Sequence, residues 1–142
     1  MEPELHGRPV TPASFFFRFY VSEAVAKARA GHLLWPLLAP FRQAIASGST
    51  SWPESLGPGA RSECHAWGSW PMYCFARHVL GVAPPRPEDG RIEIDPLYCP
   101  PLDDVRGTVM TSRGPVKVHV TWKDGAAAVE ADGPNLHINP PR

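Results

Sequence analysis

The stretch "VKVHVTWKDG" (Val116–Gly125) decides how the second half of the chain folds. Its apolar residues alternate with polar ones, which is the period of two typical of a strand with one buried face. The Lys-Asp-Gly at its end is a strong signal for a tight hairpin turn. We therefore predict a strand over 116–122, a turn, and a return strand over 126–131.

Shorter segments on either side of this hairpin continue the same pattern. Ile92 and Ile94 alternate with acidic residues, and "DGPN" (132–135) predicts a second turn before Leu136. Several short strands separated by turns favour a sheet-on-sheet arrangement. We expect residues 91–142 to form a small antiparallel β-sandwich.

The first half of the chain has helical features instead. Thr11 can cap a helix, Pro12 suits the first helical position, and Gly31 is a stop signal. The apolar residues of 15–25 cover most of the helix circumference, so we expect this helix to be buried on more than one side. Because three helices in about 80 residues cannot close a core around it, a partner or further chain must cover it.

Two shorter helices are predicted after the first. One spans about Trp35 to Ser47, and the other spans about Pro71 to Leu80 with Gly81 as its C-terminal cap. The proline-rich and charged "APPRPEDG" (83–90) then has the composition of a linker. Helices followed by strands, without alternation, predict a mixed α+β fold.

Charge and cysteine content exclude several classes of protein. The 142-residue chain has 14 basic and 14 acidic residues and no basic run, so we expect neither nucleic acid nor an anionic membrane as a partner. We find no secretory signal and no apolar run near the roughly 20 residues of a membrane span, which favours the cytoplasm. Three cysteines without dense spacing favour reduced thiols.

One loop is unusually rich in tryptophan. "SWPESLGPGARSECHAWGSWP" (51–71) holds three tryptophans, two glutamates, a cysteine and a histidine. Each residue also has an ordinary interpretation: the glutamates can be solvated or cap a helix, and the indoles can belong to a core or to a pocket wall. Cys64, His65, Cys74 and His78 lack the close cysteine pairs of a zinc site, so we predict no metal and no cofactor.

Four segments together resemble the C-terminal part of bacterial α-L-rhamnosidases, whose catalytic domain is a six-hairpin barrel. The most specific piece is "SECHAWGSWP" (62–71) followed by "VLGV" (79–82). The resemblance implies that residues 1–82 are the last helices of an α/α toroid, that 83–90 are a linker, and that 91–142 are the C-terminal β-domain. The segments are "TPASFFFRFYVSEAVAKA" (11–28), "SGSTSWPES" (47–55), "RSECHAWGSWPMYCFARHVLGV" (61–82) and "GTVMTSRGPVKVHVTW" (107–122).

The resemblance also implies a reaction and a set of site residues. The reaction is hydrolysis of terminal α-L-rhamnosides with inversion, in which one carboxylic acid protonates the leaving oxygen and a carboxylate activates water. Glu54, in "TSWPE", matches the general base, and His65, in "CHAW", matches a histidine that contacts sugar hydroxyls. The remaining candidates for the pocket wall and rim are Trp52, Trp67, Trp70 and Glu63.

The general acid of this family lies upstream of the matched segments, and nothing in Met1–Val10 resembles it. We therefore expect a truncated C-terminal portion of such an enzyme that does not hydrolyse rhamnosides alone. Its expected partners are rhamnose-containing glycosides and either the missing N-terminal part or a second copy of the chain. The alternative is a non-enzymatic remnant that binds carbohydrate or complements a partner.

Overall fold

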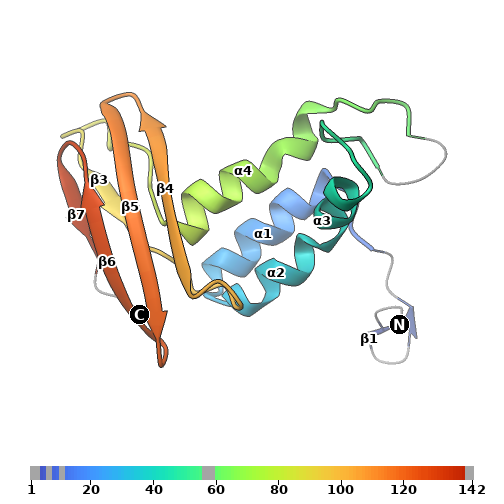
Figure 1. The fold of residues 1–142 in the computed structure, drawn as a ribbon, viewed down its shortest axis with the longest axis horizontal. Helices are drawn as coiled ribbons and strands as arrows, with labels where there is room; N and C mark the ends of the chain where they lie inside the picture. Colours follow the sequence, from blue (N-terminus) through green and yellow to red (C-terminus); the bar gives the residue numbers. More distant parts are fainter. Residues whose placement is uncertain (1–3, 6–7, 10–11, 56–59, 140–142) are drawn as a thin grey trace.

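The computed structural model describes residues 4–5, 8–9, 12–55 and 60–139. Its helices gather on one side and its long strands on the other, so the mixed α+β class is confirmed (Figure 1). The helical elements are α1 (Phe17–Lys27), η1 (Gly31–Leu33), α2 (Leu34–Leu37), α3 (Ala39–Ala46), η2 (Ala66–Ser69), α4 (Trp70–Cys74) and the π-helical turn η3 (Phe75–Val79). The strands are β1 (Glu4–Leu5), β2 (Arg8–Pro9), β3 (Ile92–Ile94), β4 (Asp104–Thr111), β5 (Gly114–Lys123), β6 (Ala126–Asp132) and β7 (Leu136–Ile138).

The first helix is shorter than its sequence predicts. It begins at Phe17, whose N–H donates to the Ser14 hydroxyl, rather than at Pro12; Thr11, the predicted cap, lies outside the described residues. It ends at Lys27, because Arg29 takes a left-handed φ of 55° two residues before Gly31.

The second predicted helix is divided into α2 and α3, with the break at Leu38. Pro40 lacks an N–H and suits only the first turn of a helix, so a new helix has to begin just before it. The third predicted helix is present as α4 and η3, and Gly81 follows it with a φ of 77°.

The predicted hairpin is confirmed. β4, β5 and β6 form an antiparallel sheet with β5 in the centre, and β5 runs into β6 through Asp124 and Gly125. Both turn residues have positive φ, at 52° and 79°, as a type I′ turn requires. β4 is a strand that the sequence pattern does not predict.

The pairing of β3 with β7 differs from the predicted antiparallel sandwich. β3 pairs with β7 in parallel, with Ile92 opposite Leu136, so the β-region is not wholly antiparallel. No short turn connects these two strands, and their relative direction is therefore not set by local turn chemistry. The pair packs with β5 through a common core of Val82, Ile92, Ile94, Val116, Val118, Val120 and Trp122.

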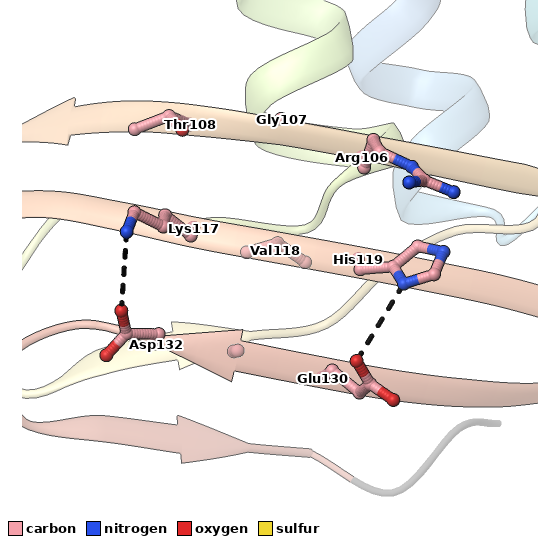
Figure 2. Close-up of a pocket in the computed structure, with 9 residues that line it drawn as sticks. Arg106, Gly107, Thr108, Lys117, Val118, His119, Glu130 and Asp132 are labelled. Atoms are coloured by element: carbon pink, nitrogen blue, oxygen red, sulfur yellow. Dashed lines mark ion pairs between the residues drawn. The ribbon is translucent and has the colours of Figure 1, made fainter.

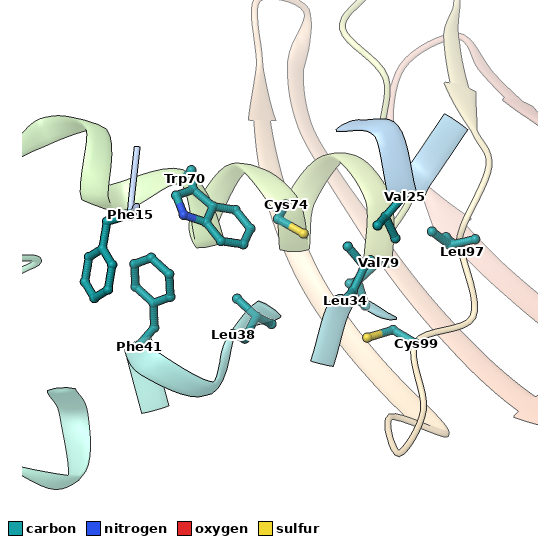
Figure 3. Close-up of a cluster of buried hydrophobic side chains, with 10 residues drawn as sticks. All are labelled: Phe15, Val25, Leu34, Leu38, Phe41, Trp70, Cys74, Val79, Leu97 and Cys99. Atoms are coloured by element: carbon teal, nitrogen blue, oxygen red, sulfur yellow. The ribbon is translucent and has the colours of Figure 1, made fainter. Parts of the chain in front are cut away.

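The helices enclose a separate core, in which Phe15 lies against Phe41 with ring centroids 4.4 Å apart (Figure 3). The first turn of α1 and the residue before it expose Phe16, Phe17 and Tyr20, with Phe17 56% exposed. The chain by itself therefore leaves this apolar face uncovered, as expected of three helices that cannot close a core around the first one. The core consists of Phe15, Val25, Leu34, Leu38, Phe41, Trp70, Cys74, Val79, Leu97 and Cys99.

The segment that follows β3, residues 95–99, joins the two cores, and we call it the shared strip. Leu97 and Cys99 enter the helical core. Tyr98 points the other way, onto the β core, where its ring lies 5.0 Å from that of Trp122. The Leu97 N–H also donates to the carbonyl of His78, at 2.8 Å. The strip therefore belongs to both halves.

Two glycines allow the helical half to approach the backbone of the strip. A Cβ on Gly31 would lie 1.9 Å from the carbonyl oxygen of Tyr98, and a Cβ on Gly81 would lie 2.3 Å from the nitrogen of Pro96. Neither contact leaves room for any side chain. The two halves are thus held at a backbone-to-backbone distance that only glycine permits.

We predict that Gly81→Ala lowers the free energy of unfolding by at least about 2 kcal/mol more than Gly48→Ala. Both glycines have positive φ, at 77° and 87°, but an added Cβ meets nothing within 4 Å at Gly48. The difference between the two losses in free energy of unfolding therefore measures the clash with the strip, because backbone strain is common to both variants. Urea unfolding followed by circular dichroism measures it, and equal losses for both variants would contradict this packing.

Candidate functional site

The tryptophan-rich loop is held by hydrogen bonds between its two arms. The Glu54 N–H donates to the Ser62 carbonyl at 2.9 Å, and the His65 N–H donates to the Trp52 carbonyl at 2.7 Å. These bonds set Trp52 beside His65, although 12 residues separate them in the sequence. Residues 56–59, at the tip, lie outside the described part of the chain.

A cavity of about 550 Å³ lies between the end of α3 and the start of η2. It combines an indole, an imidazole and four hydroxyl groups, which is a mixture of apolar wall and hydrogen-bonding groups. The sequence predicts the indole and the imidazole but not the hydroxyls, three of which come from the run "SGSTS" (47–51) and the fourth from Ser69. The lining residues are Ile45, Ser49, Thr50, Ser51, Trp52, Cys64, His65, Ala66 and Ser69.

Aromatic neighbours hold the two ring side chains of this cavity. The Trp52 ring meets the buried ring of Phe41 edge-on, with centroids 5.5 Å apart. The His65 ring lies 4.0 Å from that of Trp67. The Nδ1 atom of His65 is buried and has no hydrogen-bond partner among the described residues. Such an unpaired buried group is costly, so this imidazole has unused hydrogen-bonding capacity.

Glu54, the predicted general base, is engaged by Arg61. The guanidinium Nε donates to Oε2 at 3.2 Å and Nη2 donates to Oε1, which forms a two-point ion pair. These hydrogen bonds, helped by the charges of Arg61 and His65, hold the pKa of Glu54 below its usual range. The carboxylate is therefore ionised at neutral pH, as a base must be, but it is not among the residues that line the cavity.

The other predicted site residues lie apart from the cavity. Trp67 is 43% exposed and lies against Phe16, with ring centroids 5.3 Å apart. Trp70 is only 4% exposed and meets Phe41 in the helical core, which corrects its assignment to a pocket wall. It begins α4, which carries its ring inward with the rest of the core. Glu63 is exposed on the loop.

The outer face of the three-stranded sheet forms a second, shallower hollow of about 460 Å³ (Figure 2). Cross-strand ion pairs cover it: Lys117 lies 3.8 Å from Asp132, and His119 lies 3.8 Å from Glu130. His119 and Arg106 also donate to Asp104 and lower the pKa of that carboxyl. Each cation here has a carboxylate beside it, as on an ordinary solvated sheet face.

The residues weighed for a metal site do not come together. Within residues 12–55 and 60–139 we find no group of three histidine, cysteine or carboxylate side chains placed to hold an ion. Cys64 is exposed, whereas Cys74 and Cys99 are buried. Burial raises the pKa of Cys74 to about 12 and that of Cys99 to about 11, so both remain thiols at neutral pH.

No family model, curated protein or solved structure matches this chain. In the part that the structure describes, no helix is long and apolar enough to cross a membrane. Assignment of the site therefore depends on the loop residues and the cavity that they form.

We predict that Arg61→Gln raises the pKa of Glu54 towards that of an ordinary glutamate, because Arg61 is the main cause of its depression. Carbon-detected NMR of the Glu54 carboxyl during a pH titration measures the change. Arg86→Gln is the matched control, since it removes a similar pair with Glu93 elsewhere on the chain. An unchanged Glu54 pKa in Arg61→Gln would show that the ion pair is not formed in solution.

Proposed function

We propose that the cavity lined by Trp52 and His65 is the sugar-binding part of a glycoside hydrolase similar to α-L-rhamnosidases, which hydrolyse terminal α-L-rhamnosides with inversion. The observation that carries this proposal is the cavity in which Trp52 and His65 stand beside four hydroxyl groups. The toroid implied by the resemblance, with residues 91–142 as its C-terminal β-domain, is part of the same proposal.

The lining of the cavity suits the chemistry of a sugar. A pyranose has an apolar face of C–H groups and a rim of hydroxyls, so it is bound best by an aromatic wall and nearby donors and acceptors. Trp52 is supported from behind by Phe41, and an indole held in this way loses little freedom on binding. His65, which also lines the cavity, supplies an imidazole as a partner for a sugar hydroxyl.

The state of Glu54 supports a role as the base but not as the acid. Inverting hydrolysis needs a second carboxyl group, protonated and roughly 6.5–9.5 Å away across the sugar. Glu54 has a lowered pKa, and Glu63 is on the same loop and would approach from the same side. We therefore expect binding, but no hydrolysis, from this chain alone.

A second candidate is a carbohydrate-binding role without catalysis. It is favoured by the placement of Glu54, which is paired with Arg61 and does not line the cavity. Both candidates require the cavity to bind sugar, and they differ in whether Glu54 takes part in turnover. Hydrolysis in the presence of a polypeptide that supplies the acid, abolished by Glu54→Gln, distinguishes the first from the second.

We predict that L-rhamnose binds this cavity with a dissociation constant on the order of 1 mM, as expected of a monosaccharide with few contacts. Proton–nitrogen NMR should show the largest shifts at Trp52, His65 and Ser69. Trp52→Phe should weaken binding about tenfold because a smaller ring covers less of the sugar. Trp35→Phe is the control, since Trp35 lies against Arg42 away from the cavity.

Shifts that cluster elsewhere, or equal weakening in the two tryptophan variants, would overturn the proposal. Turnover of an aryl α-L-rhamnoside by the purified chain, abolished by Glu54→Gln, would contradict the expectation that this chain lacks half of the acid–base pair.

A further inference from the structure

A polar hollow of about 300 Å³ lies where α1 and η3 approach the shared strip. Six of the eight side chains that line it carry ionisable groups, in contrast to the largely apolar and hydroxyl lining beside Trp52. It is therefore a separate site from the proposed sugar cavity. The six are Glu23, Lys27, Arg29, Arg77, His78 and Asp95.

Two of its residues come from an unusual backbone element. Arg77 and His78 belong to the π-helical turn η3, which ends at Val79. Turns of this type are rare, and they occur frequently at functional sites because they shift side chains out of regular helical positions. Here the turn brings an arginine and a buried histidine to the same hollow.

The histidine and both carboxylates of the hollow are already engaged. The His78 Nε2 lies 2.6 Å from Glu23 Oε1, and its ring stands edge-on to that of Tyr73. Asp95 accepts a hydrogen bond from Arg29 at 3.0 Å, and Arg29 also donates to the carbonyl of Pro96 at 3.3 Å. These contacts hold the walls of the hollow in place.

Lys27 and Arg77 are the two remaining charged side chains of the hollow. Among the described residues neither has an anionic group within 4.0 Å, and three cationic side chains face only two carboxylates. The outer sheet face differs, because Lys117, His119 and Arg106 each have a carboxylate partner there. The excess of positive charge in the hollow is what an anionic ligand would neutralise.

We propose that this hollow binds the phosphate group of a small molecule through Lys27 and Arg77. A guanidinium matches two phosphate oxygens at once, and an ammonium adds a point charge beside it. Because the Nε2 atom of His78 is bonded to Glu23, it is not available to the ligand, and the pair forms a fixed wall of the hollow. The volume, at the lower limit for ligand pockets, suits a small phosphorylated compound rather than a polymer. The proposal does not depend on the sugar cavity.

Titration of the full chain with inorganic phosphate, at constant ionic strength and near neutral pH, tests this assignment. Proton–nitrogen NMR should show saturable shifts at Lys27, Arg77 and His78, with a dissociation constant on the order of 1 mM. Lys27→Gln and Arg77→Gln should each weaken binding about tenfold, since a charge-assisted hydrogen bond is lost. Arg106→Gln, on the outer sheet face, is the matched control and should not change it.

Several results would overturn the proposal. Shifts that grow without saturation, or equal weakening in Arg106→Gln, would show that phosphate acts on the chain only by general charge screening. Acetate that binds more tightly than phosphate would replace the phosphate assignment with a carboxylate. Because Lys27 is exposed, its variant tests the site even if Arg77→Gln unfolds, and Arg77→Lys provides a second variant that retains the charge.

Discussion

The contact between the shared strip and the two glycines of the helical half is the constraint on which the rest of the structure depends. Residues 95–99 send Leu97 and Cys99 into one core and Tyr98 into the other. That alternation works only if the strip lies directly against the helices, where Gly31 and Gly81 have no side chain to keep it away. One extended segment therefore completes two cores, each of which would be small by itself.

This constraint also positions the polar hollow. The strip supplies one wall of the polar hollow, through Asp95 and Leu97, and η3 and α1 supply the others. The proposed sugar cavity lies at the other end of the helical core, where Phe41 supports Trp52. The two sites thus lie on different helical elements. α3 and η2 border the cavity of hydroxyls and aromatic rings, whereas α1 and η3 border the hollow of charged groups.

The sequence predicts best those features of the fold that are set by residues close together in the chain. The Lys-Asp-Gly turn and the alternation of β5 were predicted correctly, because a type I′ turn and a half-buried strand are local features. β4 was missed, since glycine and a short apolar pattern weaken its signal. The parallel pairing of β3 with β7 and the role of the strip depend on contacts between distant segments, which no local pattern records.

In the candidate site, the sequence correctly predicts that Trp52 and His65 lie together, and both line one cavity. It does not predict the burial of Trp70, which follows from packing in the helical core. Nor does it predict the ion pair between Glu54 and Arg61, which follows from the closure of the loop.

Native-state hydrogen exchange in rising denaturant tests most directly whether the strip unites the two halves. Because both cores share residues 95–99, we expect the most protected amides of each, such as Phe41 and Val120, to converge on one free energy of opening. Separate free energies, with the β core still protected after the helical core has exchanged, would show that the halves fold independently and that the strip does not join them.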